Sequence, residues 1–262
     1  MKSINKKIIG SVIFFIFVVF LFLFTHNDKA YPSENSRPMI AITLDDSYET
    51  DYSVAYQLLK KYNIKATSFI ITSFVNTSDT YLNWDQIKEM KKYGWDVQDH
   101  TYSHKRLDKM PTKNIREELE KSDQIFKENL GYTPTAIALP QGGYNERVLK
   151  EVYKYRDVVR ITKKPSNGYN KYQEVDMKKL RAYSIDQKNT NGKGLEKVKK
   201  MIDETVKNKG VLVLYLHHIV DNPVKPYTTN KSHFKEIVEY AASKDVDFVT
   251  ISQLNDMLNK EQ

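Results

Sequence analysis

Short apolar runs alternate with amphipathic segments from residue 39 to the end of the chain, and this alternation limits the possible folds more than any other feature. The longest run, Val211–Leu216, contains only aliphatic residues and one tyrosine, which predicts a strand buried on both faces. Strands of this kind that alternate with helices predict βα units and a parallel sheet, either open or closed into a barrel. No internal repeat is visible, so we expect a single α/β domain over residues 39–262.

The periodicity of apolar residues divides this domain into alternating elements. We expect strands at residues 40–44, 66–71, 95–98, 135–139, 158–161, 180–185, 211–216 and 246–250. We expect helices at residues 52–62, 84–93, 112–130, 145–155, 195–209, 232–243 and 252–259.

Composition narrows the chemistry that the domain can carry. The chain has 262 residues, a formal net charge of +8 and no cysteine. The absence of cysteine excludes disulfides, thiolate catalysis and cysteine-based zinc sites, so a metal would have to be held by histidines and carboxylates. We expect no nucleic-acid partner, because no zinc knuckle, basic-aromatic strand or Gly-rich phosphate loop is present. The basic balance suits either anionic wall polymers and lipid head groups or general solubility.

The N-terminal residues are expected to lie outside the domain. Residues 1–7 form a basic leader, 8–24 a charge-free apolar run and 25–38 a polar tether. The run is at the lower limit for a membrane-spanning helix and slightly longer than a signal-peptide core. Basic residues before it predict a cytoplasmic N-terminus and an extracellular domain. Since no clear cleavage site follows, we expect a signal anchor that attaches the protein to the membrane; a cleaved signal would give a secreted protein.

Polar residues with catalytic potential follow four of the predicted strands. Asp45 and Asp46 end the first strand. Two adjacent carboxylates repel each other, which favours a cation at this position. The alternative is that one of them only caps the next helix. His100 follows the third strand, a turn that begins at Pro140 follows the fourth, and His217 follows the long apolar strand. In parallel α/β folds, functional residues gather at the carboxyl ends of the strands. We therefore expect these residues to meet at one rim.

The histidines have a spacing that suits a metal site. His100 and His104 are four residues apart, which would place both rings on the same side of a helical turn. Two imidazoles and one carboxylate form a common zinc ligand set that leaves a position open for water. The alternative is a pair of solvated loop residues. His217 could be a buried core histidine, but its position at the rim favours catalysis; His218 is expected to point away and to be structural.

These segments resemble the motifs of a known family. Residues 43–46, 100–104, 140–142 and 214–217 are similar, in order and spacing, to the motifs of the polysaccharide deacetylases, the NodB-homology domain of carbohydrate esterase family 4. The resemblance covers residues 39–251. It implies a distorted (β/α) barrel that removes N- or O-acetyl groups from glycans with a divalent metal, usually Zn2+, with Co2+ or Ni2+ as alternatives.

The resemblance also implies roles for individual residues. Asp46, His100 and His104 would hold the metal, Asp45 would be the general base and His217 the general acid. A base beside the metal can accept a proton from water, and a protonated histidine can supply one to the departing amine.

The turn after the fourth strand is the expected substrate contact. A backbone N–H at the Pro140 turn, that of Gln141, would stabilise the oxyanion. Tyr144 is one of several aromatic residues that could line a sugar groove. Ser47 departs from the family pattern, because glycine usually follows the second aspartate.

Two further departures concern residues that support the acid and the base. Ala138 stands where family members often carry the arginine that steadies the base, and Arg160 and Arg181, at the ends of neighbouring strands, are the candidates to replace it. The aspartate that tunes the acid histidine in the family is not recognisable, and Asp186 is the best candidate by chain order.

The expected function is N-deacetylation of an N-acetylglucosamine-containing cell-wall or surface polysaccharide, with an acetylated glycan as the partner. The alternatives are an O-acetyl esterase acting on xylan or a related glycan, and a catalytically silent glycan-binding domain. The silent domain is disfavoured because the candidate metal ligands, base and acid are all present. We expect a monomer.

Overall fold

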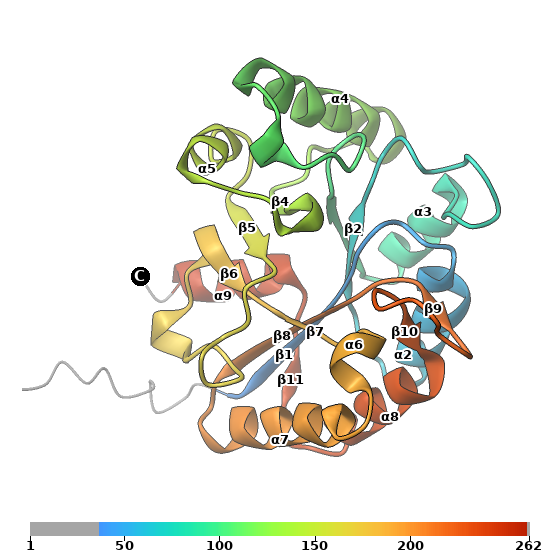
Figure 1. Cartoon of the computed structure of the whole chain (residues 1–262), viewed down its shortest axis with the longest axis vertical. Helices are drawn as coiled ribbons and strands as arrows, with labels where there is room; N and C mark the ends of the chain where they lie inside the picture. Colours follow the sequence, from blue (N-terminus) through green and yellow to red (C-terminus); the bar gives the residue numbers. More distant parts are fainter. Residues whose placement is uncertain (1–36, 261–262) are drawn as a thin grey trace, which may run out of the picture. The chain divides into compact units, whose positions relative to one another are not determined.

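A computed structural model describes residues 37–260, and a nine-stranded sheet organises this part of the chain (Figure 1). Its strands are β1 (Met39–Leu44), β2 (Thr67–Ile70), β3 (Asp96–Asp99), β4 (Ala136–Ala138), β5 (Val158–Ile161), β6 (Leu180–Arg181), β7 (Tyr183–Ser184), β8 (Val211–Leu216) and β11 (Asp247–Phe248). A separate two-stranded sheet pairs β9 (Ile219–Val220) with β10 (Thr229–Asn230). The large sheet runs in the order β6-β5-β4-β3-β2-β1-β8-β7, with β11 beside β1, and all its pairings are parallel. The predicted (β/α) barrel is therefore present in a nearly closed form.

Helices cover the outside of the sheet. They are α2 (Gln57–Lys61), α3 (Trp84–Lys92), α4 (Thr112–Leu130), α5 (Glu146–Val152), α6 (Gln187–Thr190), α7 (Gly194–Lys207), α8 (Lys231–Ala242) and α9 (Ile251–Lys260). A π-helix, η1 (Asp51–Tyr56), precedes α2, and four short 3-10 turns, η2 (Leu107–Lys109), η3 (Pro140–Gly142), η4 (Tyr172–Glu174) and η5 (Met177–Lys179), lie in the connections. Figure 1 shows α4 beside α5 and α7 beside α8. The predicted helix 52–62 is thus a π-helix followed by an α-helix.

The central strands β1 and β8 explain why the predicted apolar runs contain almost no polar side chains. Alternate residues of β1 face opposite ways: Ile40 and Ile42 pack in the core beneath the helices, whereas Met39 and Ala41 pack inside the barrel. Each face is covered, so each position is apolar. The two strands pair along their whole length, from Met39 opposite Val211 to Leu44 opposite Leu216. This register brings the residues that follow the two strands to the same rim.

The predicted strand 180–185 is the main error in the fold. The structure divides it into β6, which pairs with β5, and β7, which pairs with β8, so the chain crosses the opening of the barrel at Ala182. Asn170 bridges this opening. Its backbone pairs with that of Val211, and its side-chain amide donates a hydrogen bond to the carbonyl oxygen of Arg181 at 3.0 Å. Hydrophobic periodicity marks buried residues but not a change of partner strand, which is why one continuous strand was predicted.

The predicted leader (1–7), the apolar run (8–24) and all but the last two residues of the tether (25–38) lie outside the described residues. Between residues 37 and 260, no helix has both the length and the apolar character needed to cross a bilayer.

Candidate active site

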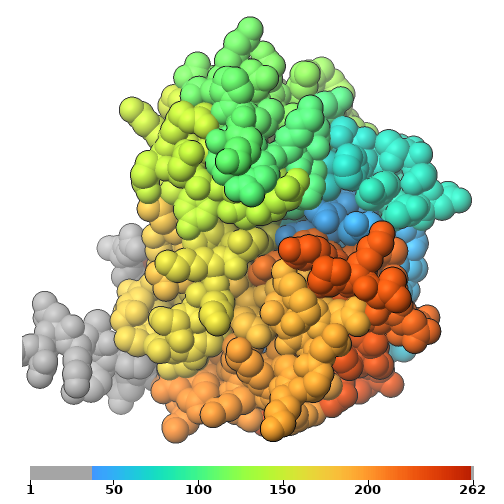
Figure 2. Space-filling model, in the orientation of Figure 1, coloured from blue at the N-terminus to red at the C-terminus, as the bar shows by residue number. Residues whose placement is uncertain are grey.

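A cavity of about 650 Å3 opens at the carboxyl ends of β1, β3 and β8 and beside the turn that follows β4. Its lining includes most of the predicted site residues: Asp45, Asp46, His100, His104, Gln141 and His217. The convergence predicted from the strand ends is thus present in the structure. Figure 2 shows that segments from the middle and the last third of the chain, coloured green to orange, lie next to one another on one face of the molecule.

Asp46, His100 and His104 form a cluster that could hold a metal ion. Nε2 of His100 lies 3.3 Å from Asp46 Oδ1, and Nε2 of His104 lies 3.1 Å from the same oxygen. Ligand atoms at about 2.1 Å from a tetrahedral zinc ion are about 3.4 Å apart, so these separations fit a shared ion. Asp46 Oδ1 is buried and has no hydrogen-bond partner. A buried carboxylate oxygen that faces two imidazole nitrogens and receives no hydrogen bond is consistent with a cation bound between the three side chains.

The segment from His100 to His104 is not the helical turn that the spacing predicted. It is an irregular loop in which Thr101 and His104 have left-handed backbone angles, with φ of 69° and 58°. The two rings nevertheless come together, with centroids 4.8 Å apart. Left-handed conformations are unfavourable for residues other than glycine and persist where the surrounding structure enforces them.

Hydrogen bonds on the far side of His100 orient its ring. His100 Nδ1 lies 2.7 Å from the carbonyl oxygen of Ala138, so a proton on Nδ1 leaves Nε2 free to bind a metal. The preceding residue, Asp99, is fully buried and accepts hydrogen bonds from Arg156, from Ser122 Oγ at 2.6 Å and from the backbone N–H of Thr101 at 2.8 Å. This network holds the loop that carries the first histidine.

Asp45 is paired with Arg160, one of the two arginines proposed to replace the missing family residue. Arg160 Nη2 donates a hydrogen bond to Asp45 Oδ2, and both side chains are almost completely buried. Arg160 lies directly opposite Ala138 in the β4–β5 pairing. The guanidinium group thus comes from the neighbouring strand at the same level. The remaining oxygen, Asp45 Oδ1, has no hydrogen-bond partner and is available to accept a proton.

Arg160 reaches Asp45 through the interior of the barrel. Its guanidinium carbon lies 4.6 Å from the ring centroid of Tyr215 and 5.5 Å from that of Phe69, so aromatic faces flank the charge. Arg181, the other candidate, is exposed and lines a different cavity from Asp45, so the structure excludes it as the partner of Asp45.

His217 is held by Asp186, as chain order suggested. His217 Nδ1 lies 2.8 Å from Asp186 Oδ2, and the backbone N–H of His217 donates to Asp186 Oδ1 at 3.1 Å. Burial alone would lower the pKa of His217, but the hydrogen bond and charge of Asp186, with the charges of Asp45 and Asp46, raise it to about 9. At neutral pH the imidazole is therefore protonated, and its Nε2 lies 3.9 Å from Asp45 Oδ2.

Pro140, Gln141 and Tyr144, the three residues predicted to contact substrate, lie in different places around the turn after β4. Gln141 lines the cavity and has a left-handed backbone, with φ of 53°. The following amides, of Gly142 and Gly143, donate to turn carbonyl oxygens, whereas the described part of the chain shows no such turn bond for the Gln141 amide. Pro140 is buried at the start of the turn. Tyr144 does not line this cavity; it lies in a second cavity nearby.

Tyr227 and Lys188 are among the cavity residues that the sequence did not mark. Tyr227 is 60% exposed, and Lys188 Nζ lies 4.0 Å above the centroid of its ring. Both belong to polar segments without apolar periodicity, so no pattern marked them. His218, predicted to be structural, stacks on Tyr48 at a centroid distance of 4.5 Å.

Fold and site together define a class: a parallel (β/α) barrel with a candidate metal centre and a paired carboxylate and imidazole at the carboxyl ends of its strands. The sequence model of the family described as polysaccharide deacetylase matches residues 33–156. This match agrees with the family that the motifs indicated.

Named relatives agree with this assignment. Over 130 residues the chain is 33% identical to YxkH of Bacillus subtilis (strain 168), which carries the name of a polysaccharide deacetylase; the match covers 50% of this chain and 46% of the relative. It is also 33% identical over 147 residues to a poly-beta-1,6-N-acetyl-D-glucosamine N-deacetylase of Staphylococcus aureus (strain MSSA476), covering 51% and 49%. The chain thus spans about half the length of these relatives.

Solved structures share the fold. The acetyl xylan esterase from Clostridium thermocellum, solved in complex with a cobalt ion, superposes with a TM-score of 0.56 at 20% identity, covering 84% of this chain and 91% of the other. The Xyl-CE4 domain of a xylanase from the Trinervitermes trinervoides hindgut metagenome gives a TM-score of 0.57 at 18% identity, covering 85% and 92%. These likenesses support the barrel architecture.

The metal cluster predicts a binding result that does not depend on activity. Equilibrium dialysis of the purified chain should find one tightly bound Zn2+, and His104→Ala should weaken its binding by about 100-fold or more, because one of three protein ligands is lost. His233→Ala is the matched control, since His233 Nδ1 contacts Thr190 Oγ1 and lies outside the cluster. Equal zinc affinity in the parent and in His104→Ala would contradict the assignment.

The Arg160–Asp45 pair predicts a loss of stability. Arg160→Met should lower the free energy of unfolding by about 3–5 kcal/mol, because it leaves a buried carboxylate without its partner. Adding Ala138→Arg, on the facing position of β4, should recover part of this loss. Arg37→Met removes exposed ion pairs with Asp245 and Asp247 and should change stability by less than about 1 kcal/mol. Denaturant titration measures all four, and a value for Arg160→Met no larger than the control would refute the pairing.

The His217–Asp186 contact predicts a shift in titration. The raised pKa means that the acid form of His217 is present below pH 9 and is lost above it. Asp186→Asn removes the negative charge at Nδ1, so the pKa of His217 should fall and the alkaline limb of the pH–rate profile should move to lower pH. NMR titration of the ring measures the pKa directly. An unchanged value would show that Asp186 does not set it.

Proposed function

We propose that this protein is a metal-dependent hydrolase that removes N-acetyl groups from an N-acetylglucosamine-containing cell-wall or surface polysaccharide. The observation that carries the proposal is that one cavity contains the metal cluster, a carboxylate fixed by a buried arginine and an imidazole fixed by a buried aspartate. The substrate class rests on the relative named as a poly-beta-1,6-N-acetyl-D-glucosamine N-deacetylase. We further propose that residues 8–24 anchor the chain in a membrane, with the domain outside the cell.

Amide hydrolysis needs a stronger nucleophile than neutral water and a protonated leaving group. A divalent ion held by Asp46, His100 and His104, Zn2+ in the first place, would polarise the acetyl carbonyl and lower the pKa of a bound water from 15.7 to about 7. Asp45 Oδ1, free of hydrogen bonds, is placed to accept the proton that water releases as it attacks the carbonyl carbon. Arg160 keeps the other oxygen of this carboxylate engaged, so the free oxygen keeps a fixed direction.

The second half of the reaction breaks the carbon–nitrogen bond. His217, protonated and hydrogen-bonded through Nδ1 to Asp186, can donate its Nε2 proton to the departing sugar nitrogen. The sugar then leaves as an amine and the acetyl group as acetate. The amide of Gln141 is the candidate donor to the carbonyl oxygen, which gains negative charge in the transition state.

Acetate release tests the proposal. The zinc-loaded protein should release acetate from N-acetylglucosamine oligomers faster than from acetylated xylan, and a chelator should abolish the activity until metal is restored. Asp45→Asn and His217→Ala should each reduce kcat by about 100-fold or more, the range expected for loss of a general base or acid. His218→Ala is the control, because it removes an adjacent imidazole outside the cavity, and it should stay within about twofold of the parent. Release from xylan alone, or turnover unaffected by either catalytic substitution, would refute the proposed function.

A further inference from the structure

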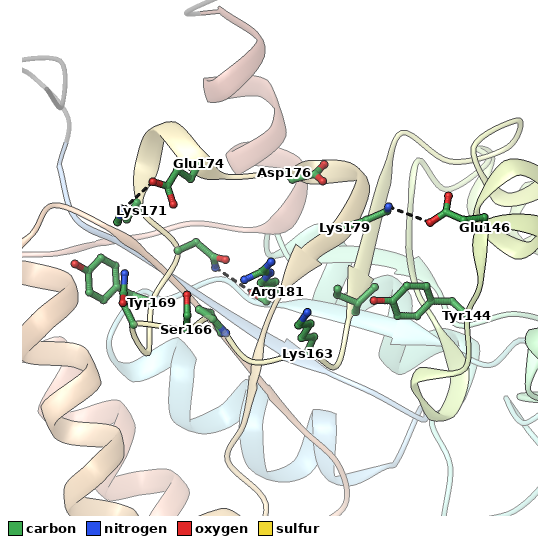
Figure 3. A pocket seen from close by; sticks show the side chains of 14 residues that line it. Tyr144, Glu146, Lys163, Ser166, Tyr169, Lys171, Glu174, Asp176, Lys179 and Arg181 are labelled. Carbon is green, nitrogen blue, oxygen red and sulfur yellow. Dashed lines mark hydrogen bonds and ion pairs between the residues drawn. The ribbon is translucent and has the colours of Figure 1, made fainter. Parts of the chain in front are cut away.

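The structure has a second cavity, of about 370 Å3 (Figure 3). Its walls come from the turn before α5, the end of β5 and the connection that follows it, and the end of β6. A volume of this size is typical of sites that hold a small ligand or one unit of a polymer.

The charges of this cavity are only partly balanced. Lys171 pairs with Glu174 at 2.8 Å, and Lys179 pairs with Glu146 at 3.4 Å. Lys163 and Arg181, in contrast, have no ion-pair partner among residues 37–260. Figure 3 shows both side chains in the middle of the cavity, between the two ion pairs.

One further acid lines the cavity. Asp176 Oδ1 accepts a hydrogen bond from the backbone N–H of Lys178 at 2.9 Å, which ties this carboxylate to the start of η5. In Figure 3 it lies at the far edge of the cavity from Lys163. The centre of the cavity therefore presents two cations to a ligand, with the acids at its edges.

Two tyrosines form opposite walls, with Tyr144 at one end of the cavity and Tyr169 at the other (Figure 3). Tyr169 is fixed by close packing on Gly210, where a Cβ atom would lie only 2.3 Å from the tyrosine ring. Aromatic rings with polar tips suit the mixed apolar and hydroxyl surface of a sugar ring. Tyr144, predicted to contact substrate, is thus placed to do so in this cavity.

The two cavities share a wall. Thr162 lines the catalytic cavity, whereas its neighbours Ile161 and Lys163 line the second one. Gln141 and Tyr144, three residues apart, are divided between the two in the same way. Three residues span at most about 10 Å, so the cavities are close enough for adjoining parts of one polymer to occupy both.

We propose that the second cavity binds an anionic group, a carboxylate or phosphate, on the same glycan chain whose acetamide occupies the catalytic cavity. Lys163 and Arg181 would contact the anion and the tyrosines its sugar ring. This inference rests on the proposed function, and it adds a preference for polymers in which a charged sugar lies near the acetylated one. A neutral polymer of N-acetylglucosamine would leave both cations without a partner.

Binding measurements test the inference separately from catalysis. The full chain carrying Asp45→Asn, which blocks turnover, is titrated calorimetrically with three oligomers of equal length: neutral N-acetylglucosamine units, alternate units with a carboxylate, and alternate units with a phosphate. Lys163→Gln/Arg181→Gln in this background should raise the Kd of an anionic oligomer by about tenfold, since two ion pairs are lost, and leave that of the neutral oligomer within twofold. Added salt should weaken only the anionic oligomers.

Lys171→Gln/Lys179→Gln is the matched control, because it removes the same charge from the same cavity at residues that already have partners. It should change each Kd by less than about threefold. If both double variants raised the Kd of the anionic oligomer equally, binding would depend on general positive charge, and the inference would be overturned. The same would follow if an anionic oligomer bound no better than the neutral one. The carboxylate and phosphate arms show which anion is bound. Acetate release by the parent reports on the proposed function independently, so the two failures are distinguishable.

Discussion

The need to balance buried negative charge shapes this end of the barrel. Four carboxylates lie at or just below the rim: Asp45, Asp46, Asp51 and Asp186. An unpaired charge is costly in a protein interior, and each of these carboxylates is stabilised in a different way. Arg160 neutralises Asp45, and protonated His217 neutralises Asp186. Burial, with the charges of Asp45 and Asp46, raises the pKa of Asp51 well above its usual value, which favours its uncharged form. The fourth, Asp46, faces two imidazoles and no fixed cation within the described residues, and there a metal ion fits.

Backbone strain is concentrated at the same rim. Left-handed angles occur at Asp46, Ser47, Thr101, His104 and Gln141, which belong to the turns after β1, β3 and β4. Ser47 stands where the family usually has glycine, and its φ of 60° explains that preference. Its hydroxyl accepts a hydrogen bond from the backbone N–H of Ile71 at 2.7 Å, which helps to hold the turn without glycine. Tight turns of this kind aim side chains from separate strands at one point, which regular strands and helices cannot do.

The sequence was sufficient for the barrel and for the residues that converge on the cavity, because strand ends in a parallel sheet lie together. It did not determine how His100 and His104 meet, since their spacing favours a helix and only the left-handed turn angles produce the loop. Which arginine pairs with Asp45, Arg160 or Arg181, depends on strand register. Apolar periodicity does not reveal the register. The sequence placed Tyr144 after the fourth strand but did not show which cavity it lines; the structure places it in the second cavity, since three residues are enough to cross the shared wall.

The position of Arg160 shows what the fold requires of the base and what it leaves free. A buried aspartate at the end of β1 needs a guanidinium inside the barrel, but two facing positions, on β4 and β5, can supply it. Here β4 carries Ala138, and small side chains at Ala41 and Ala136 also line the interior, which leaves room for the long side chain from β5. Tyr215 and Phe69 then flank the charge and separate it from water. The constraint therefore acts on the location of the positive charge and not on the strand that carries it, so the missing arginine of the third motif does not mean a lost function.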